Sequence, residues 1–297
     1  MAFFRHRKYL LLSAIGIFIL ASLFYSFVIE PGRLVVTEST IEIEKLDPAL
    51  DGLKIVAISD LHCGSNAVNA EKLRDLLALA NGQNPDIVVL LGDFVSEYEG
   101  GTKLRMPLDE MTQNICGLKA RYGVFAVMGN HDDWYDSELV KNAVQAAGYR
   151  ILDDEIATLD INNTKLRLLG LRDHLRINSW KAFSEQTRHL IDTDGGSGDI
   201  IVLEHSPDVL PMITGELSIS PDTRLMLAGH THGGQVWLPI LGRPIIPSSY
   251  GQKYAYGHIR DQGLDMFVTS GVGTSILPFR FLVPPEIAVI TLKRKAN

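Results

Sequence analysis

Five short motifs in this sequence combine carboxylate, amide and imidazole side chains. Imidazole and carboxylate ligands together suit zinc, iron or manganese, and no cysteine thiolate is needed. In the spacings Asp-x-His and His-x-His, an extended chain points both side chains the same way, so both reach one centre. The motifs are Asp-Leu-His at 60–62, Gly-Asp at 92–93, Gly-Asn-His-Asp at 129–132, Glu-His at 204–205 and Gly-His-Thr-His at 229–232. Together they predict a metal site.

The histidines of the chain are concentrated in these motifs. A single Asp or His after a strand is usually a cap, a turn residue or a hydrogen-bonded polar group. Five of the nine histidines lie in the motifs, however, and this favours one shared site over separate local roles. Two metals that share a carboxylate, roughly 3.5–4 Å apart, form the usual clamp for displacement at phosphorus. The other histidines, at 6, 174, 189 and 258, are interpreted as surface, interface or substrate-edge residues.

Each motif directly follows a short apolar run that is typical of a buried strand. Ligand sites in open α/β sheets gather beyond the carboxyl ends of strands, so five strands would deliver the motifs to one edge. Helical spacing of apolar residues predicts helices over 70–80, capped by Asn69, and over 137–147. Short strands rich in Gly and Pro near the C-terminus indicate a mixed sheet system in an α/β layered fold. The five runs are 54–59, 87–91, 124–128, 200–203 and 225–228.

Composition excludes several classes of protein. The chain has 297 residues, of which 46% are hydrophobic, and this suffices for a large core and excludes a disordered tail. Cys63 and Cys116 allow one bridge at most, which excludes a disulfide scaffold, and Cys63 is interpreted as a packing residue. With 28 basic and 35 acidic side chains the net charge is −7, so no nucleic-acid partner is expected. Residues 34–297 show no linker or repeat, and we expect one domain there.

Residues 9–29 form an uncharged apolar segment preceded by a basic flank at 1–8, with Arg5, Arg7 and Lys8. About 20 such residues cross a hydrocarbon core of about 30 Å, so the segment is predicted to be a transmembrane anchor. A cleaved signal peptide and a buried soluble helix are the alternatives. Because basic flanks stay in the cytosol, the prediction is a single-pass protein of the bacterial inner membrane with an extracytoplasmic domain.

The ordered series of motifs resembles the calcineurin-like metallophosphoesterase superfamily. The resemblance spans about two-thirds of the chain. It is closest to the membrane-anchored bacterial phosphodiesterases of the YaeI/YkuE type, through the apolar N-terminal segment and the segment SGVGTSILPFRFLVPPEI at 270–287. It implies a two-sheet mixed β-sandwich flanked by helices, an α/β fold, and two divalent metal ions. Manganese, iron and zinc all accept these ligands, so the sequence does not choose among them.

The resemblance also assigns roles to individual residues. It implies that His131 contacts the phosphoryl oxygen and protonates the departing alkoxide; the alternative is a polar residue that orients Asn130. Asp93 would bridge the two metals. The implied ligands are Asp60, His62 and His232 for one metal, and Asn130, His205 and His230 for the other.

One departure from the superfamily narrows the function. Its Ser/Thr protein phosphatases carry GD-x-VDRG, whose second aspartate pairs with the catalytic histidine. Here Ser96 and Glu97 replace the Asp-Arg pair, which argues against a protein phosphatase. The residue that orients His131 is left open, since Asp132 is adjacent in sequence but adjacent side chains need not face each other.

The predicted reaction is hydrolysis of a phosphodiester or pyrophosphate bond in a membrane-associated or lipid-linked substrate. Arg280, beside Phe279 and Phe281, is a candidate for gripping a substrate phosphate, with a surface salt bridge as the alternative. The runner-up is a UDP-2,3-diacylglucosamine pyrophosphatase of lipid A synthesis, although its cytosolic substrate conflicts with the predicted orientation. Alternatives of other classes are a nuclease, which needs a basic groove or stacking aromatics, and a non-catalytic metal-binding cell-surface protein.

Overall fold

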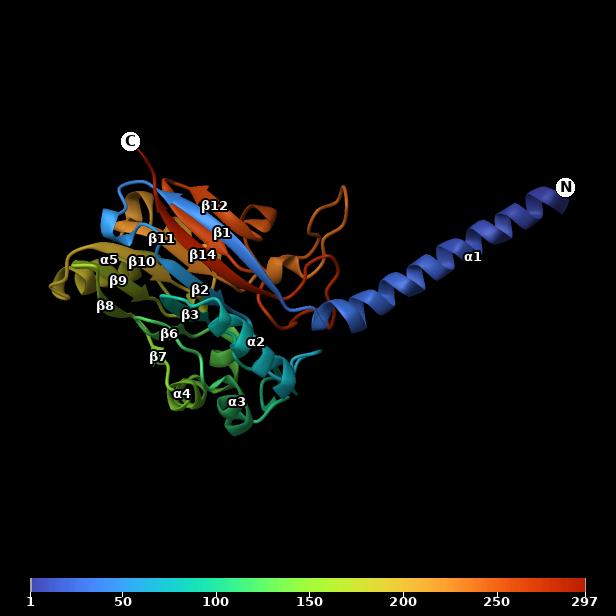
Figure 1. Cartoon of the computed structure of the whole chain (residues 1–297), viewed down its shortest axis with the longest axis horizontal. Helices are drawn as coiled ribbons and strands as arrows, with labels where there is room; N and C mark the ends of the chain where they lie inside the picture. The colour runs from blue at the N-terminus through green and yellow to red at the C-terminus, as the bar shows by residue number, and fades with distance from the viewer. Residues whose placement is uncertain (1, 297) are drawn as a thin grey trace.

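Two six-stranded β-sheets lie face to face in a computed structural model that describes residues 2–296 (Figure 1). The first sheet holds, in spatial order, β1 (Val35–Ile43), β14 (Glu286–Arg294), β2 (Lys54–Ile58), β3 (Ile87–Leu91), β6 (Val124–Val127) and β7 (Arg150–Ile151). The second holds β12 (Gly257–Asp261), β13 (Leu264–Val268), β11 (Thr223–Ala228), β10 (Asp199–Leu203), β9 (Thr164–Gly170) and β8 (Glu155–Ile161). A separate hairpin joins β4 (Glu97–Tyr98) to β5 (Lys103–Leu104).

Both sheets are mixed. In the first, β14 runs parallel to β1 and antiparallel to β2, while β2, β3, β6 and β7 are parallel. In the second, the outer strands β8 and β12 are antiparallel to their neighbours and the inner four are parallel. The mixed α/β sandwich predicted from the sequence is confirmed.

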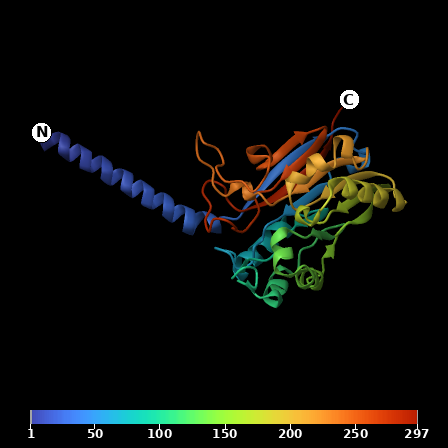
Figure 2. The same ribbon diagram turned by 180° about the vertical axis from the view of Figure 1, so that it is seen from behind.

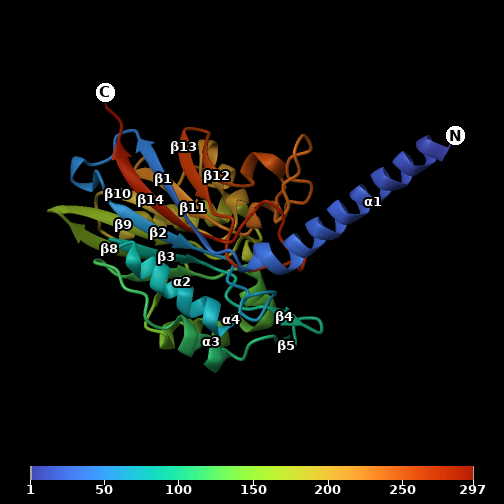
Figure 3. The ribbon, with the colours of Figure 1, turned by 45° about the vertical axis from the view of Figure 1, so that its right-hand side comes forward.

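Helices cover the outer faces of both sheets. The helices α2 (Ala70–Gly82), α3 (Leu108–Ile115) and α4 (Asn130–Ala146) pack on the first sheet, and α5 (Trp180–Thr193) packs on the second. Along β2 the side chains alternate: Val56 and Ile58 contact the helices, whereas Ile55 and Ala57 face the other sheet. Figure 3 shows α2, α3 and α4 together on one side of the strands. Short 3₁₀ turns lie at Pro48–Leu50, His174–Arg176, Pro207–Met212, Gly215–Leu217, His232–Gly234 and Gly251–Tyr254.

Both predicted helices are present, but only the first begins where the sequence predicted. Asn69 caps α2 as predicted, because its side chain accepts a hydrogen bond from the Lys72 amide at 3.0 Å. The helix predicted over 137–147 begins earlier, at Asn130, and is kinked at Asp136, where the backbone is extended. The sequence pattern therefore revealed only the half of α4 that lies beyond the kink.

The N-terminal segment is helical and stands out from the body of the protein (Figures 1 and 2). α1 (Ala2–Phe24) continues through a π-helical turn, Tyr25–Ile29, into a 3₁₀ turn, Glu30–Gly32. By length and composition the span Tyr9–Gly32 is sufficient to cross a membrane, and almost none of its most apolar window is buried. Met1, in the predicted flank 1–8, and Asn297, in the predicted domain 34–297, lie outside the described residues. In the flank, the side chains of residues 2–6 and 8 also lie outside the description.

The end of this segment is fixed to the domain. Phe27 packs on Phe279 with ring centroids 4.6 Å apart. The fully buried Glu30 accepts a hydrogen bond from the Leu282 amide at 2.6 Å, and Lys72 donates one to the Pro31 carbonyl at 2.5 Å. The end of the N-terminal segment is therefore attached to the domain through α2 and through residues 279–282.

Candidate metal centre

All seven predicted metal ligands lie beyond the carboxyl ends of strands, at one edge of the sandwich. β2, β3 and β6 of the first sheet lead into four of them, and β10 and β11 of the second lead into the other three. Several of these residues have a left-handed backbone, which non-glycine residues adopt only when the surroundings enforce it, and such strain clusters at functional sites. The left-handed residues are Asp60, His62, Asp93, His230 and His232, with φ between 42° and 69°.

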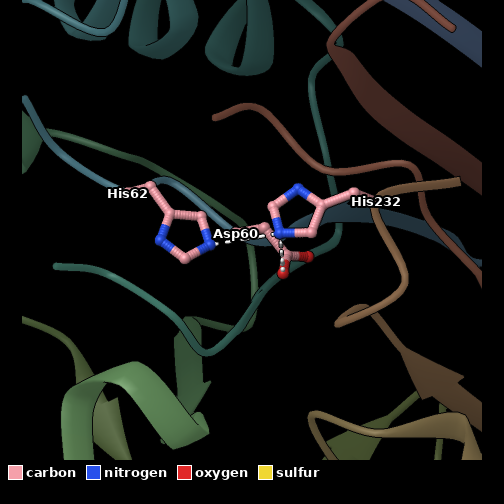
Figure 4. Close-up of side chains that lie close together, drawn as sticks. All are labelled: Asp60, His62 and His232. Atoms are coloured by element: carbon pink, nitrogen blue, oxygen red, sulfur yellow. Dashed lines mark hydrogen bonds and ion pairs between the residues drawn. The ribbon is translucent and has the colours of Figure 1, made fainter. Parts of the chain in front are cut away.

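Asp60, His62 and His232 form the first group, and Figure 4 shows their side chains converging. One ligand atom from each lies within 4.8 Å of the others. The Nε2 atoms of His62 and His232 are 3.2 Å apart, and His232 Nε2 is 3.3 Å from Asp60 Oδ1. Burial lowers the pKa of His62 to about 4 and holds that of His232 well below its ordinary value, so both rings are neutral and can bind a cation.

Asp93, His205 and His230 form the second group, with the same mutual spacing. His205 Nε2 lies 3.1 Å from His230 Nδ1 and 3.2 Å from Asp93 Oδ2. The same Asp93 oxygen is 3.5 Å from Nε2 of His62 in the first group, so one carboxylate reaches both. This is the position that a bridging ligand requires.

Two buried oxygens at the centre have no hydrogen-bond partner among the described residues: Asp60 Oδ1 and Asn130 Oδ1. A buried polar atom without a partner is costly, and two bound cations would satisfy these oxygens, one each. The donor set of imidazole, carboxylate and amide also suits a divalent transition metal. The residues present therefore fit the two metals that the sequence implies.

Backbone carbonyls orient two of the imidazoles. His62 Nδ1 lies 3.1 Å from the Val95 carbonyl, and His205 Nδ1 lies 2.6 Å from the Leu91 carbonyl. A ring that donates from Nδ1 presents the lone pair of Nε2, and in both residues Nε2 faces the other ligands.

Asp132 ties two of the ligand-bearing loops together. Its fully buried carboxylate accepts hydrogen bonds from the amides of Asp93, Phe94, Val95 and Gly129, at 2.8–3.2 Å. These bonds join the loop after β3 to the start of α4. Asp132 therefore positions Asp93 and does not face His131.

Glu97 orients His131, a role that the sequence alone did not predict for it. Glu97 lies on the hairpin strand β4, and its two carboxylate oxygens are 2.7 and 2.9 Å from His131 Nδ1. Burial acts to lower the pKa of His131, but the hydrogen bond to Glu97 and the charges of Asp93 and Glu97 outweigh it, so the pKa is raised. On the other side of the ring, Nε2 lies 3.1 Å from Ser275 Oγ. The sequence did contain a signal for this role: Glu97 is a carboxylate one position after Ser96, which replaces the second aspartate of the phosphatase motif.

Arg280 is not on the wall of the site. It has no exposed surface, and its guanidinium donates to the carbonyls of Ser270, Gly271, Gly273 and Val283. A substrate phosphate has no access to a group buried and bonded in this way, and the surface salt bridge does not describe it either. The guanidinium lies 3.4 Å from His232 Nδ1, so Arg280 supports the ligand loop from behind.

Two cavities share His131 and Ser275 in their walls. The first, of about 270 Å³, contains Asp93 and Asn130 and has an apolar wall that includes Trp134, Ile245 and Leu277. The second, of about 640 Å³, is lined mostly by polar side chains. Its wall includes Asn66, Ser96, Arg105, Thr274 and, from the N-terminal segment, Phe27. A substrate at the metals would thus have an apolar space on one side and a polar space on the other.

The family model for calcineurin-like phosphoesterases matches residues 53–234, which contain all five motifs. The chain belongs to this family. This calcineurin-like phosphoesterase is therefore a metal-dependent phosphoester hydrolase, and its family typically binds two divalent metals. The match ends before β12, β13 and β14, so the domain bounds 34–297 stay a prediction.

This phosphoesterase is similar to known proteins over most of its length. YkuE of Bacillus subtilis, described as an uncharacterized metallophosphoesterase, is 31% identical over 91% of this chain and 89% of its own. The phosphodiesterase YaeI of Escherichia coli is 28% identical over 80% of this chain and 82% of its own. A transmembrane protein with a metallophosphoesterase domain, from Danio rerio, is 29% identical over 89% of this chain and 58% of its own.

Proposed function

We propose that this phosphoesterase hydrolyses a phosphodiester or pyrophosphate bond in a membrane-associated or lipid-linked substrate. The observation that carries the proposal is the position of the site. The fixed end of the N-terminal segment supplies Phe27 to one cavity beside His131, and the other cavity has an apolar wall. A reacting phosphorus at the metal centre would lie next to the membrane anchor, with room for an apolar group.

Seven side chains would hold the two cations. Asp60, His62 and His232 would form one set, Asn130, His205 and His230 would form the other, and Asp93 would lie between them. When bound, two such cations lower the pKa of a coordinated water and neutralise charge on the phosphoryl oxygens. The protein contributes the fixed geometry, because backbone amides and carbonyls hold both the carboxylates and the imidazoles.

His131 is the proposed proton donor to the departing alkoxide. Glu97 holds the Nδ1 side of the ring, so Nε2 faces the cavities, and the raised pKa favours the protonated ring. Ser275 shows that an oxygen on this side is within hydrogen-bond distance of Nε2. The proposed departing oxygen would take a similar position.

The proposed location is the bacterial inner membrane, with the domain on the extracytoplasmic side. Support comes from the apolar span Tyr9–Gly32 and from the basic residues of the preceding flank, since Lys and Arg next to a span remain cytosolic. The names of two relatives, a phosphodiesterase and a transmembrane protein, agree with a diester substrate at a membrane.

The test is a substrate panel with the full-length protein in lipid nanodiscs loaded with Mn²⁺. Soluble bis-p-nitrophenyl phosphate reports the chemistry, and phospholipids, lipid-linked diphosphates and UDP-2,3-diacylglucosamine report the substrate class, with products identified by mass spectrometry. We expect cleavage of a membrane-embedded ester that is lost in His131→Ala while metal content is retained. Turnover of the soluble diester together with no cleavage of any lipid would contradict the membrane substrate but not the hydrolase.

A further inference from the structure

A loop of the domain carries apolar side chains that the fold does not bury. It comprises residues 236–247, with the sequence VWLPILGRPIIP, between β11 and β12. Ile240 at its tip is fully exposed, Leu241 is 69% exposed, and Trp237 and Ile245 are each about 40% exposed. An apolar patch of this kind on a protein surface usually marks a contact with another protein or with a membrane.

The loop has a fixed shape. Leu238 and Gly242 exchange two backbone hydrogen bonds of 2.8 Å, which close a tight turn around Ile240. Ile240 lies at φ 78°, a left-handed conformation that a β-branched residue rarely adopts. Such strain is maintained only when the surrounding structure enforces it, and here its result is a large apolar side chain held out into the surroundings.

The one charged residue of this loop is turned inward. Arg243 donates from Nη1 to the Gly233 carbonyl at 2.5 Å, and its guanidinium lies over the ring of Tyr256 at 5.1 Å from the centroid. Its backbone amide is bonded to Gln252 at 3.1 Å. The tip of the loop therefore presents no charge, which is a condition for entry into lipid.

The loop is linked to the N-terminal segment by contacts through Phe281. At its base, the Trp237 amide donates to the Phe281 carbonyl at 2.9 Å. The ring of Phe281 in turn meets Tyr25 of the N-terminal segment edge-on, with centroids 6.3 Å apart. In Figures 1 to 3 the orange segment between β11 and β12 projects from the same end of the body from which α1 leaves. A bilayer crossed by α1 would lie directly against this loop.

We infer that the tip of the 236–247 loop inserts into the lipid bilayer as a second contact beside the anchor. The inference rests on the membrane anchoring proposed above. Two attachment points fix the tilt of the domain, whereas a single helix leaves it free to rotate about its end. Ile245 and Pro247 of the same loop line the apolar cavity beside His131, so insertion places that cavity at the membrane surface.

The test places an environment-sensitive fluorophore on the loop in the full-length protein. The background is Cys116→Ser, because Cys116 is exposed whereas Cys63 is buried and does not label. Ile240→Cys carries the fluorophore NBD, and Asn162→Cys, in the exposed turn between β8 and β9 away from α1, is the matched control. Both proteins are reconstituted in nanodiscs that contain phospholipids with nitroxide-labelled acyl chains.

We expect NBD at position 240 to emit at shorter wavelength and to lose most of its emission to the nitroxide lipids, and NBD at 162 to do neither. A protein that co-elutes with nanodiscs but is not quenched at 240 overturns the loop inference alone. A blue shift without quenching also overturns it, because a second copy of the chain then covers the loop. A protein that does not co-elute with nanodiscs contradicts the anchor and this inference together.

Discussion

The pair of Glu97 and His131 decides the protonation state of the group proposed to act on the leaving oxygen. Their atoms are 2.7 Å apart and both side chains are largely buried, so water screens the interaction weakly. The pKa of Glu97 is lowered and that of His131 is raised. The ion pair is therefore complete above the pKa of Glu97 and is lost as the pH rises through the raised pKa of His131.

Replacing Glu97 by Gln removes the negative charge and should lower the pKa of His131. The protonated ring is then lost at lower pH, so the alkaline limb of the kcat profile moves toward acid and kcat at pH 7 falls by roughly 10- to 100-fold. The effect should be larger for diphenyl phosphate than for bis-p-nitrophenyl phosphate, since its departing phenolate is more basic. Metal content should not change.

Glu99→Gln is the matched control, because Glu99 is exposed and pairs only with Lys103 at 2.8 Å among the described contacts. Its pH profile should match that of the unaltered protein. If Glu97→Gln lowers kcat equally at every pH and for both substrates, Glu97 acts only as a structural support and the assignment of its role is wrong.

The sequence predicted the strands better than the contacts of the loops that follow them. The apolar runs before each motif predicted β2, β3, β6, β10 and β11, because strands buried on both faces leave an unmistakable apolar pattern. The partner of His131 could not be predicted, since Glu97 lies on a two-residue strand whose direction depends on the β4–β5 hairpin. Arg280 was misread for a related reason: the sequence does not show that its own loop, between β13 and β14, folds around it and presents four carbonyls to it.

Glycines at the strand ends allow the ligand loops to touch. A Cβ on Gly229 would clash with Ser59 and with a carboxylate oxygen of Asp60. Gly229→Ala should therefore displace Asp60, reduce the bound metal by about one equivalent and cost about 1–3 kcal/mol of stability from overpacking. Elemental analysis after dialysis against Mn²⁺ measures the first effect, and chemical unfolding measures the second.

Gly82→Ala is the control for this substitution, since nothing lies within 4 Å of the added Cβ at the end of α2. It should retain both metals and keep or slightly increase stability. Full metal occupancy in Gly229→Ala would show that the approach of the two loops is not required for binding.

The metal centre joins the two halves of the sandwich. Its first-sheet ligands follow β2, β3 and β6, and its second-sheet ligands follow β10 and β11, so a bound pair of cations cross-links elements that otherwise meet through apolar packing. Because the unfolded chain does not preserve this arrangement, the cations bind the native state preferentially and stabilise it.

Removal of the metals should therefore lower the Tm of the full-length protein. At a free Mn²⁺ concentration about 100 times Kd, binding contributes about 2.7 kcal/mol per site, which corresponds to roughly 5–10 °C in a domain of this size. Differential scanning calorimetry before and after chelation, followed by addition of Mn²⁺, measures the loss and its recovery. Asp93→Ala, which removes the carboxylate between the two groups, should show little response to Mn²⁺. If Mn²⁺ raised the Tm of this variant as much as that of the unaltered protein, the cations would stabilise the protein at another place. Apolar packing alone would then hold the two sheets together.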